Sequence, residues 1–126
     1  MNLLITGCCG HIGSYVAENV HKIKKIKKTI LVDNIKSNRF CSLFNLKKKN
    51  NLKFYLIDVD KKNSLAKFKN IHYVIHCASM TNAEKSFGKE KDMYKNNIKC
   101  LENVIDFCKK NKSKLIHLSS TSVYGK

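Results

Sequence analysis

Five short apolar runs, separated by stretches with helical spacing, constrain the fold of this chain more than any other feature. The runs are LLIT (3–6), TILVD (29–33), KFYLID (53–58), HYVIHCAS (72–79) and KLIHLSS (114–120). They are continuously apolar rather than alternating, which is typical of parallel strands buried on both faces under helices. The pattern predicts an α/β fold, a doubly wound parallel sheet in the order 3-2-1-4-5. A ligand of such a sheet binds at the switch point between strands one and four, here over residues 7–13 and 77–82.

Three helices are predicted between the runs. Asp60 is placed to cap a short helix that carries Leu65 and Phe68. The other two helices are predicted from apolar residues that recur on one stripe. The stripes are Ile12, Val16, Val20 and Ile23 in the first helix, and Tyr94, Ile98, Leu101, Ile105 and Cys108 in the last.

Length and composition indicate one globular domain over residues 1–126, because 43% of the residues are hydrophobic and 27% are charged. The net charge of +16 comes almost wholly from lysine, and Arg39 is the only arginine. Since base and phosphate recognition favours arginine, no specific nucleic-acid partner is expected. No apolar run reaches the length of a membrane span and no signal peptide is recognisable. We therefore expect a cytoplasmic protein with reduced thiols and no membrane partner.

The segment TGCCGHIG lies between the first apolar run and the first helix. Gly7, Gly10 and Gly13 are three residues apart, as in a dinucleotide loop whose backbone approaches a pyrophosphate at a helix N-terminus. Its two cysteines and one histidine raise the alternative of a metal or redox site. Neighbouring cysteines usually point apart, and no second pair at zinc spacing follows, so no metal is expected. The phosphate loop is the favoured interpretation.

Asp33 ends the second apolar run, twenty residues after Gly13. A carboxylate at this place in a dinucleotide-binding unit accepts hydrogen bonds from the adenosine ribose and repels a 2′-phosphate. The position favours NAD over NADP, although Lys36 and Arg39 follow closely and would attract a phosphate.

These motifs are similar to those of the extended short-chain dehydrogenase/reductase family, the NAD-dependent epimerases and dehydratases of nucleotide sugars, and most of all to the UDP-glucose 4-epimerases. The resemblance rests on six pieces in the family's order: TGCCGHIGS, LVDN, IDV, VIHCAS, NN before the last helix, and SSTSVYG. It implies a Rossmann-type NAD(P)-binding domain, NAD as the cofactor and a nucleotide sugar as the substrate.

The resemblance also assigns roles to single residues. The residues implied in cofactor binding are Gly7, Gly10, His11, Ile12, Gly13, Asp33, Asn34, Ser37, Asn38, Asp58, Val59, Cys77, Ala78, Ser79, Thr81 and Asn97. Within this set, residues 11–12 would lie against the pyrophosphate and residues 33–38 around the adenosine ribose. Residues 58–59 would contact the adenine, and residues 77–81 would pass under the cofactor. Asn97 would support the region after the fourth strand.

Ser120, four residues before Tyr124, matches the active-site serine or threonine of the family. It would donate a hydrogen bond to the reacting sugar oxygen and help a neighbouring base to remove its proton. The dehydratases of the family have Asp-Glu after this position, whereas Thr121 and Ser122 stand here. This difference favours epimerisation, in which a hydride leaves a sugar carbon and returns to its other face.

The Tyr and Lys of the family's YxxxK pair are absent from the sequence. We therefore expect the N-terminal part of a longer enzyme, truncated after strand five, without the substrate domain and inactive alone. The resemblance implies a homodimer for the full-length enzyme. The alternatives are a sugar reductase or decarboxylase of the same family, or a non-catalytic dinucleotide-binding module.

Overall fold

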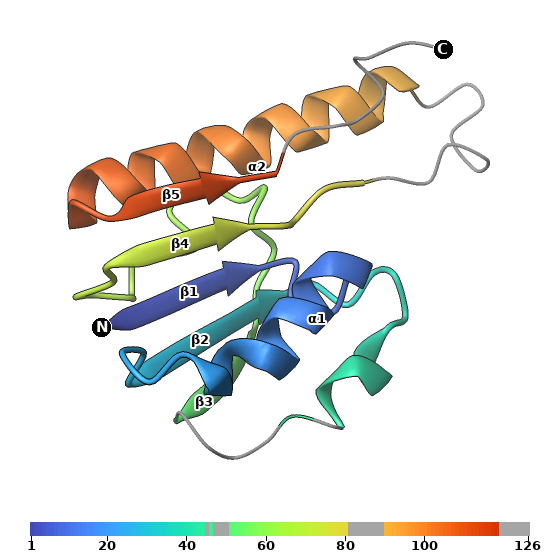
Figure 1. Ribbon diagram of the computed structural model, residues 1–126. Coiled ribbons are helices and arrows are strands. Elements are labelled where there is room, and N and C mark those ends of the chain that lie inside the picture. The colour runs from blue at the N-terminus through green and yellow to red at the C-terminus, as the bar shows by residue number, and fades with distance from the viewer. Residues whose placement is uncertain (45, 47–50, 81–89, 119–126) are drawn as a thin grey trace, which may run out of the picture.

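Parallel strand pairing organises the chain (Figure 1). A computed structural model describes residues 1–44, 46, 51–80 and 90–118. The strands are β1 (Asn2–Thr6), β2 (Lys28–Asp33), β3 (Leu52–Leu56), β4 (Tyr73–His76) and β5 (Lys114–His117). Their order is β3-β2-β1-β4-β5 and every pair is parallel, so the predicted fold class and strand order are confirmed.

The helices cover both faces of the sheet, as a doubly wound fold requires. They are α1 (His11–Asn19), the 3₁₀ turns η1 (Val20–Lys22) and η2 (Phe40–Leu43), and α2 (Glu90–Asn111). In Figure 1, α1 lies in front of β1 and β2, and α2 runs along β5. Within the described residues, no helix has the length and apolar character needed to cross a membrane.

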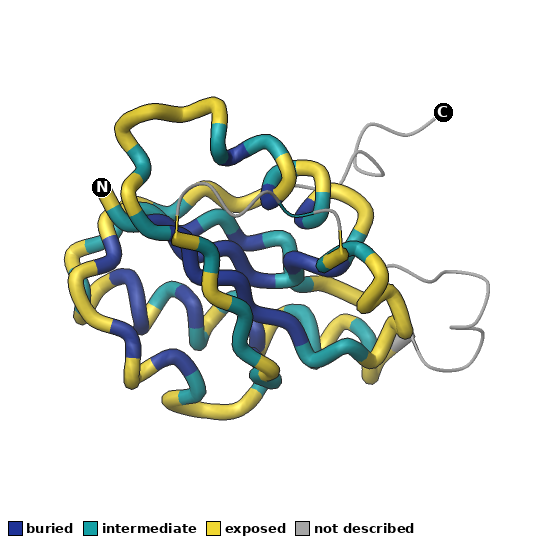
Figure 2. The backbone as a smooth tube through the Cα atoms, turned by 90° about the horizontal axis from the view of Figure 1, so that it is seen from below, coloured by how far each residue is buried: buried dark blue, intermediate teal, exposed yellow. Residues whose placement is uncertain are grey.

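Two hydrophobic cores lie on opposite faces of the sheet, and β1 contributes to both. Leu3 and Ile5 pack with Ala17 of α1, whereas Leu4 packs with Val104 of α2. Figure 2 shows the central strands as the most deeply buried part of the chain. This burial on both sides is the physical reason why the runs that form β1 and β2 are continuously apolar.

The buried face of α1 differs from the predicted stripe. Gly13, Ala17 and Val20 are buried, whereas Ile12 and Ile23 are 52% and 51% exposed. Small residues face the sheet because α1 starts very close to the preceding turn. The prediction was therefore wrong at both ends of the stripe.

The buried face of α2 is also rotated from the predicted stripe. Cys100, Val104, Phe107 and Cys108 are buried, at the spacing of one helical face. Tyr94, by contrast, is 69% exposed. Only the C-terminal end of the predicted stripe was correct. Tyr94 and Ile98, both exposed, form a second apolar stripe on the outer side of α2.

A short helix after Asp60 was predicted, and the structure has a series of turns there instead. Asn63 has a φ of 59°, in the left-handed region, and this interrupts any helix through the segment. The turns still place Leu65 and Phe68 in the core beside α2, where both side chains are buried.

Candidate functional site

The carboxyl ends of β1, β2 and β4 bring the predicted site segments together. The Gly7 N–H donates to the Val32 carbonyl at 2.8 Å, and the Cys77 N–H donates to the Thr6 carbonyl at 3.0 Å. The glycine loop is thereby held between the ends of the two strands that flank β1. This is the switch point of the sheet, where a doubly wound fold binds its ligand.

The three glycine positions of the loop differ in what an added Cβ would contact. Gly7 has a φ of +69°, and a Cβ there would lie 2.5 Å from the backbone N of Ala78. A Cβ on Gly13 would lie 2.1 Å from the Gly7 carbonyl oxygen. A Cβ on Gly10 would meet only that same oxygen, at 3.2 Å, within 4 Å. Gly7 and Gly13 are thus required for packing, whereas Gly10 borders open space in which a ligand can approach the backbone.

The N-terminus of α1 opens directly onto Gly10, which is its N-cap residue. No side chain of the described residues caps this helix end. The first backbone N–H groups of a helix lack intrahelical partners and attract anions. His11 and Ile12, both exposed, begin the helix at this point. The arrangement fits the pyrophosphate-binding role that the sequence predicted for these residues.

Asp33 connects the glycine loop to the segment after β2. The residue is 8% exposed, and its carboxylate accepts the Cys9 N–H at 2.9 Å and the Ile35 N–H at 2.8 Å. Ile35 has a φ of 58°, a left-handed conformation that is strained for a β-branched residue. The acid is therefore positioned before any ligand arrives, at the cost of local backbone strain.

Asn34 and Asp58 lie side by side beyond the ends of β2 and β3. Asn34 Nδ2 donates to Asp58 Oδ1 at 2.9 Å, and Lys36 Nζ lies 2.6 Å from Asp58 Oδ2. Burial would raise the pKa of Asp58, but the hydrogen bonds from Lys36 and Asn34 outweigh it and lower that pKa. Lys36 is thus engaged with Asp58, whose carboxylate partly neutralises its charge.

The remaining residues predicted to contact the adenosine, Ser37, Asn38 and Val59, differ in their exposure and contacts. Ser37 is exposed, and the Asn38 N–H closes a turn onto the Ile35 carbonyl at 2.9 Å. Val59 is buried in the core beside α2, and its carbonyl accepts a hydrogen bond from Asn103 Nδ2 at 2.8 Å. The Val59 side chain is therefore a core residue, and only its backbone is left for an adenine contact.

The segment after β4 passes beside the glycine loop. Ala78 abuts Gly7, Cys77 is half-buried and Ser79 is exposed. Asn97 of α2 holds the next residue, Met80, by accepting its N–H at 2.8 Å and donating to its carbonyl at 3.2 Å. The structure thus places Asn97 where it supports this segment. Thr81 and Ser120 lie outside the described residues.

The two cysteines of the loop do not point apart as expected. Cys8 Sγ and Cys9 Sγ lie 4.0 Å from each other, and both residues are buried in the core beside α1. Burial, followed by the charges of Cys9 and Asp33, strongly raises the pKa of Cys8, and burial also raises the pKa of Cys9. Both thiols are therefore protonated near neutral pH.

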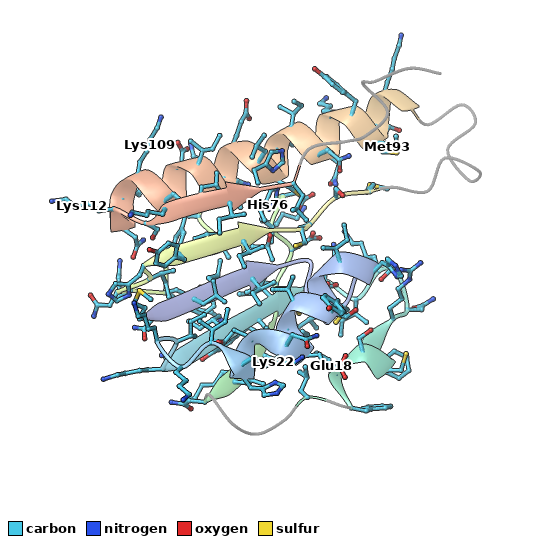
Figure 3. All side chains as sticks on the ribbon, in the orientation of Figure 1. Glu18, Lys22, His76, Met93, Lys109 and Lys112 are labelled. Carbon is cyan, nitrogen blue, oxygen red and sulfur yellow. The ribbon has the colours of Figure 1, made fainter. Side chains whose placement is uncertain are left out.

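Sequence reasoning missed a polar pair inside the sheet, Thr6 and His76. Thr6 Oγ1 and His76 Nδ1 are joined by a hydrogen bond of 2.7 Å, and His76, labelled in Figure 3, is only 3% exposed. The ring of His117 stacks on it with centroids 5.5 Å apart. The available signal was a histidine near the end of each of two neighbouring apolar runs, and the two residues pair in register.

The parallel sheet, the glycine loop at its switch point and the acid after β2 define a doubly wound α/β domain of the dinucleotide-binding class. A sequence model described as the NAD dependent epimerase/dehydratase family matches residues 3–126. The chain belongs to this family. The recognition made from its motifs is thereby confirmed.

Individual relatives cover several activities. The chain is 33% identical over 131 residues to dTDP-D-glucose 4,6-dehydratase of Dictyostelium discoideum, covering 98% of the chain and 30% of the relative. It is 30% identical over 124 residues to UDP-N-acetyl-alpha-D-glucosaminuronate decarboxylase of Bacillus cytotoxicus, covering 98% of the chain and 37% of the relative. A mutant UDP-glucuronic acid 4-epimerase of Bacillus cereus, solved with NAD, matches with a TM-score of 0.85 and 26% identity. The match covers 100% of this chain and 42% of that protein. The chain thus spans between 30% and 42% of these proteins.

We expect substitutions at Gly10 and Gly13 to separate ligand binding from folding. Gly10→Val should leave the fold intact, because its backbone is extended, and lower NAD affinity by about 10-fold or more by occupying the ligand's space. Gly13→Ala should reduce the free energy of unfolding by about 2 kcal/mol or more, because of its clash with the turn. Denaturant unfolding and calorimetric NAD titration measure both, with Ser14→Ala as the matched helix control. Equal destabilisation by both glycine variants would contradict this division.

His76 should make the stability of the protein depend on pH. Burial, and then the neighbouring His117, lowers the pKa of His76 from 6.5 to about 4. The unfolded chain therefore binds a proton that the folded chain excludes, so stability is complete above pH 6.5 and falls as the pH drops towards 4. The loss from this group is about 3 kcal/mol at most.

Urea unfolding at a series of pH values measures this dependence. His76→Asn keeps a polar partner for Thr6 and should flatten the curve in that window, whereas His21→Gln, at a half-buried histidine of η1 outside the sheet, serves as the control. A curve with the same slope in His76→Asn as in the unsubstituted protein would show that another group is responsible.

Proposed function

We propose that this chain forms the NAD-binding part of a nucleotide-sugar epimerase. The observation that carries the proposal is the glycine loop at the sheet's switch point, with Asp33 already fixed at its side by two hydrogen bonds. Family membership supports the cofactor, because the matching family is described as NAD dependent. When bound, NAD would supply the acceptor for a hydride taken from a sugar carbon and returned to its other face.

The residues present fit the cofactor. The uncapped N-terminus of α1, beside Gly10, would bind the pyrophosphate. Asp33 would accept hydrogen bonds from the adenosine ribose, because each carboxylate oxygen has a lone pair left after binding one N–H. The adenine would lie near Asn34 and Asp58, whose mutual hydrogen bond closes that end of the site.

Ser120 is our proposal for the residue that contacts the substrate. It would donate a hydrogen bond to the sugar hydroxyl that loses its proton, so that charge developing on that oxygen is stabilised. Thr121 and Ser122 supply no carboxylic acid to protonate a leaving hydroxyl. This absence of an acid favours epimerisation over dehydration.

A decarboxylase of the same family is the second candidate function. It is favoured by the 30% identity to the UDP-N-acetyl-alpha-D-glucosaminuronate decarboxylase. Both activities begin with hydride removal from a sugar, so the cofactor site serves either one. The part of the protein that binds the sugar would decide between them.

We also propose that the full-length protein works in the cytoplasm as a homodimer. The supporting observation is the second apolar stripe of α2, in which Tyr94 and Ile98 are 69% and 37% exposed. Exposed apolar side chains in one row favour burial against another surface. Pairing through two copies of this face would bury both rows.

Cofactor preference tests the role of Asp33. We expect NAD to bind more tightly than NADP, because the buried carboxylate repels a 2′-phosphate. Asp33→Ala should reduce the ratio of NAD affinity to NADP affinity. Asp33→Asn is the sharper variant, because it removes the charge but keeps one oxygen that can accept an N–H. Titration of each variant with both cofactors measures the ratio, and equal affinity of the unsubstituted protein for NAD and NADP would refute the assignment.

Activity tests the epimerase proposal. The 126-residue chain should bind NAD without interconverting UDP-sugars, because it has no YxxxK pair to act as the base. A longer form that includes such a pair should epimerise a UDP-sugar, and Ser120→Ala in that form should lower kcat by about 10-fold or more. Chromatography of the sugar products measures this. Release of carbon dioxide from a UDP-uronic acid, without epimerisation, would favour the decarboxylase instead.

A further inference from the structure

A compact group of three metal-ligating side chains lies beneath the glycine loop. Cys8 Sγ, Cys9 Sγ and a carboxylate oxygen of Asp33 lie within 4.8 Å of one another, and all three residues are buried. The proposed NAD site uses the backbone of this loop, and both thiols pack in the core beside α1 without a role in NAD binding. Two sulfurs and one oxygen are a donor set that thiophilic divalent cations accept.

The spacing of the two sulfurs matches what such a cation needs. Two sulfurs bonded to one tetrahedral zinc ion at about 2.3 Å lie about 3.8 Å apart. The observed separation of Cys8 Sγ and Cys9 Sγ is 4.0 Å. A cation can therefore replace the present thiol–thiol contact with only a small movement of either side chain.

The carboxylate is held in place without losing its capacity to bind a cation. Asp33 Oδ2 accepts one N–H from Cys9, and Oδ1 accepts one from Ile35. Each oxygen of an ionised carboxylate has a further lone pair. The hydrogen bond from Cys9 also ties the carboxylate to the same residue that supplies one of the sulfurs.

A third thiol lies next to the residue that attaches η2 to the glycine loop. Ser42 Oγ of η2 donates to the Cys9 carbonyl at 3.3 Å, so η2 is attached to the glycine loop. Cys41, the residue before Ser42, is an exposed free cysteine. A third thiol therefore lies one residue away from the contact between η2 and the loop.

We propose that Cys8, Cys9 and Asp33 bind a thiophilic divalent cation such as Cd²⁺ or Zn²⁺, and that this cation and the dinucleotide exclude each other. Binding forms two metal–sulfur bonds and one metal–oxygen bond. It breaks two S–H bonds, and both protons leave to the solvent without any oxidation. The exclusion follows because the cation takes one of the two free Asp33 lone pairs that the ribose hydroxyls would use, and this part rests on the proposed function.

Cation binding at these two thiols also changes the proton balance, because a metal ligates cysteine as its thiolate. A cation with high affinity for sulfur displaces protons from thiols of this kind. The expected signature is the release of two protons for each cation bound.

Cadmium titration of the purified protein without NAD tests the site directly. We expect one Cd²⁺ per chain, an ultraviolet thiolate-to-cadmium charge-transfer band and two protons released. Cys8→Ala with Cys9→Ala should abolish the band. The matched control is Cys100→Ala with Cys108→Ala, which removes two buried thiols from the opposite core and should keep the band. Asp33→Asn should keep the two-thiolate band and weaken affinity by about 10-fold or more.

Two results would overturn the cation site: a band that persists in Cys8→Ala with Cys9→Ala, or the absence of a stoichiometric Cd²⁺ band in the unsubstituted protein. ¹¹³Cd nuclear magnetic resonance of the unsubstituted protein needs no variant and should give one resonance with the shift of a two-thiolate site. A shift typical of oxygen ligands alone would refute it.

Adding NAD then separates the two proposals. Excess NAD should lower the apparent Cd²⁺ affinity by about 10-fold or more, as mutual exclusion requires. Unchanged Cd²⁺ affinity in a protein that binds NAD would overturn the exclusion. A protein that binds Cd²⁺ at the two thiols but shows no NAD binding would support the cation site and count against the proposed function alone.

Discussion

The close approach between the start of α1 and the end of β1 is the constraint on which the rest of the structure depends. A Cβ on Gly13 would lie 2.1 Å from the Gly7 carbonyl oxygen, so the helix begins almost in contact with the turn before it. That approach directs the helix N-terminus over the carboxyl edge of the sheet and leaves Gly10 beside open space. It also brings Cys9 within reach of Asp33. One contact between two backbone segments thus fixes where the uncapped helix N-terminus, an acid and a pair of thiols lie.

The strands and their order could be predicted from the sequence, because burial on both faces requires continuous apolar runs and helical crossovers require parallel pairing. The switch point followed from that order, and the glycine spacing located the loop within it. The acid at position 33 was also predictable, since it ends a buried run. These features depend on local sequence and on general rules of topology, and the structure confirms the arrangement.

The helix faces and the side-chain pairs could not be predicted, because they depend on contacts between distant segments. Periodicity favoured Ile12, but α1 lies so close to the turn that Gly13 and Ala17 face the sheet. In α2, two apolar stripes have the same period, and only packing decides which one is buried. Thr6 and His76 are 70 residues apart, so their hydrogen bond follows from strand register and not from any local pattern.

The two hydrogen bonds accepted by Asp33 have a consequence for how this protein can change during evolution. The carboxylate that would select the cofactor also satisfies the buried Cys9 N–H and fixes the left-handed turn at Ile35. A substitution that admits a 2′-phosphate therefore leaves backbone donors without partners, at about 1–3 kcal/mol each where they are buried. A marginally stable domain tolerates such a loss only after stabilising changes elsewhere. The order in which mutations can be accepted is thus constrained. A change of cofactor preference at Asp33 depends on whether stabilising mutations are already present.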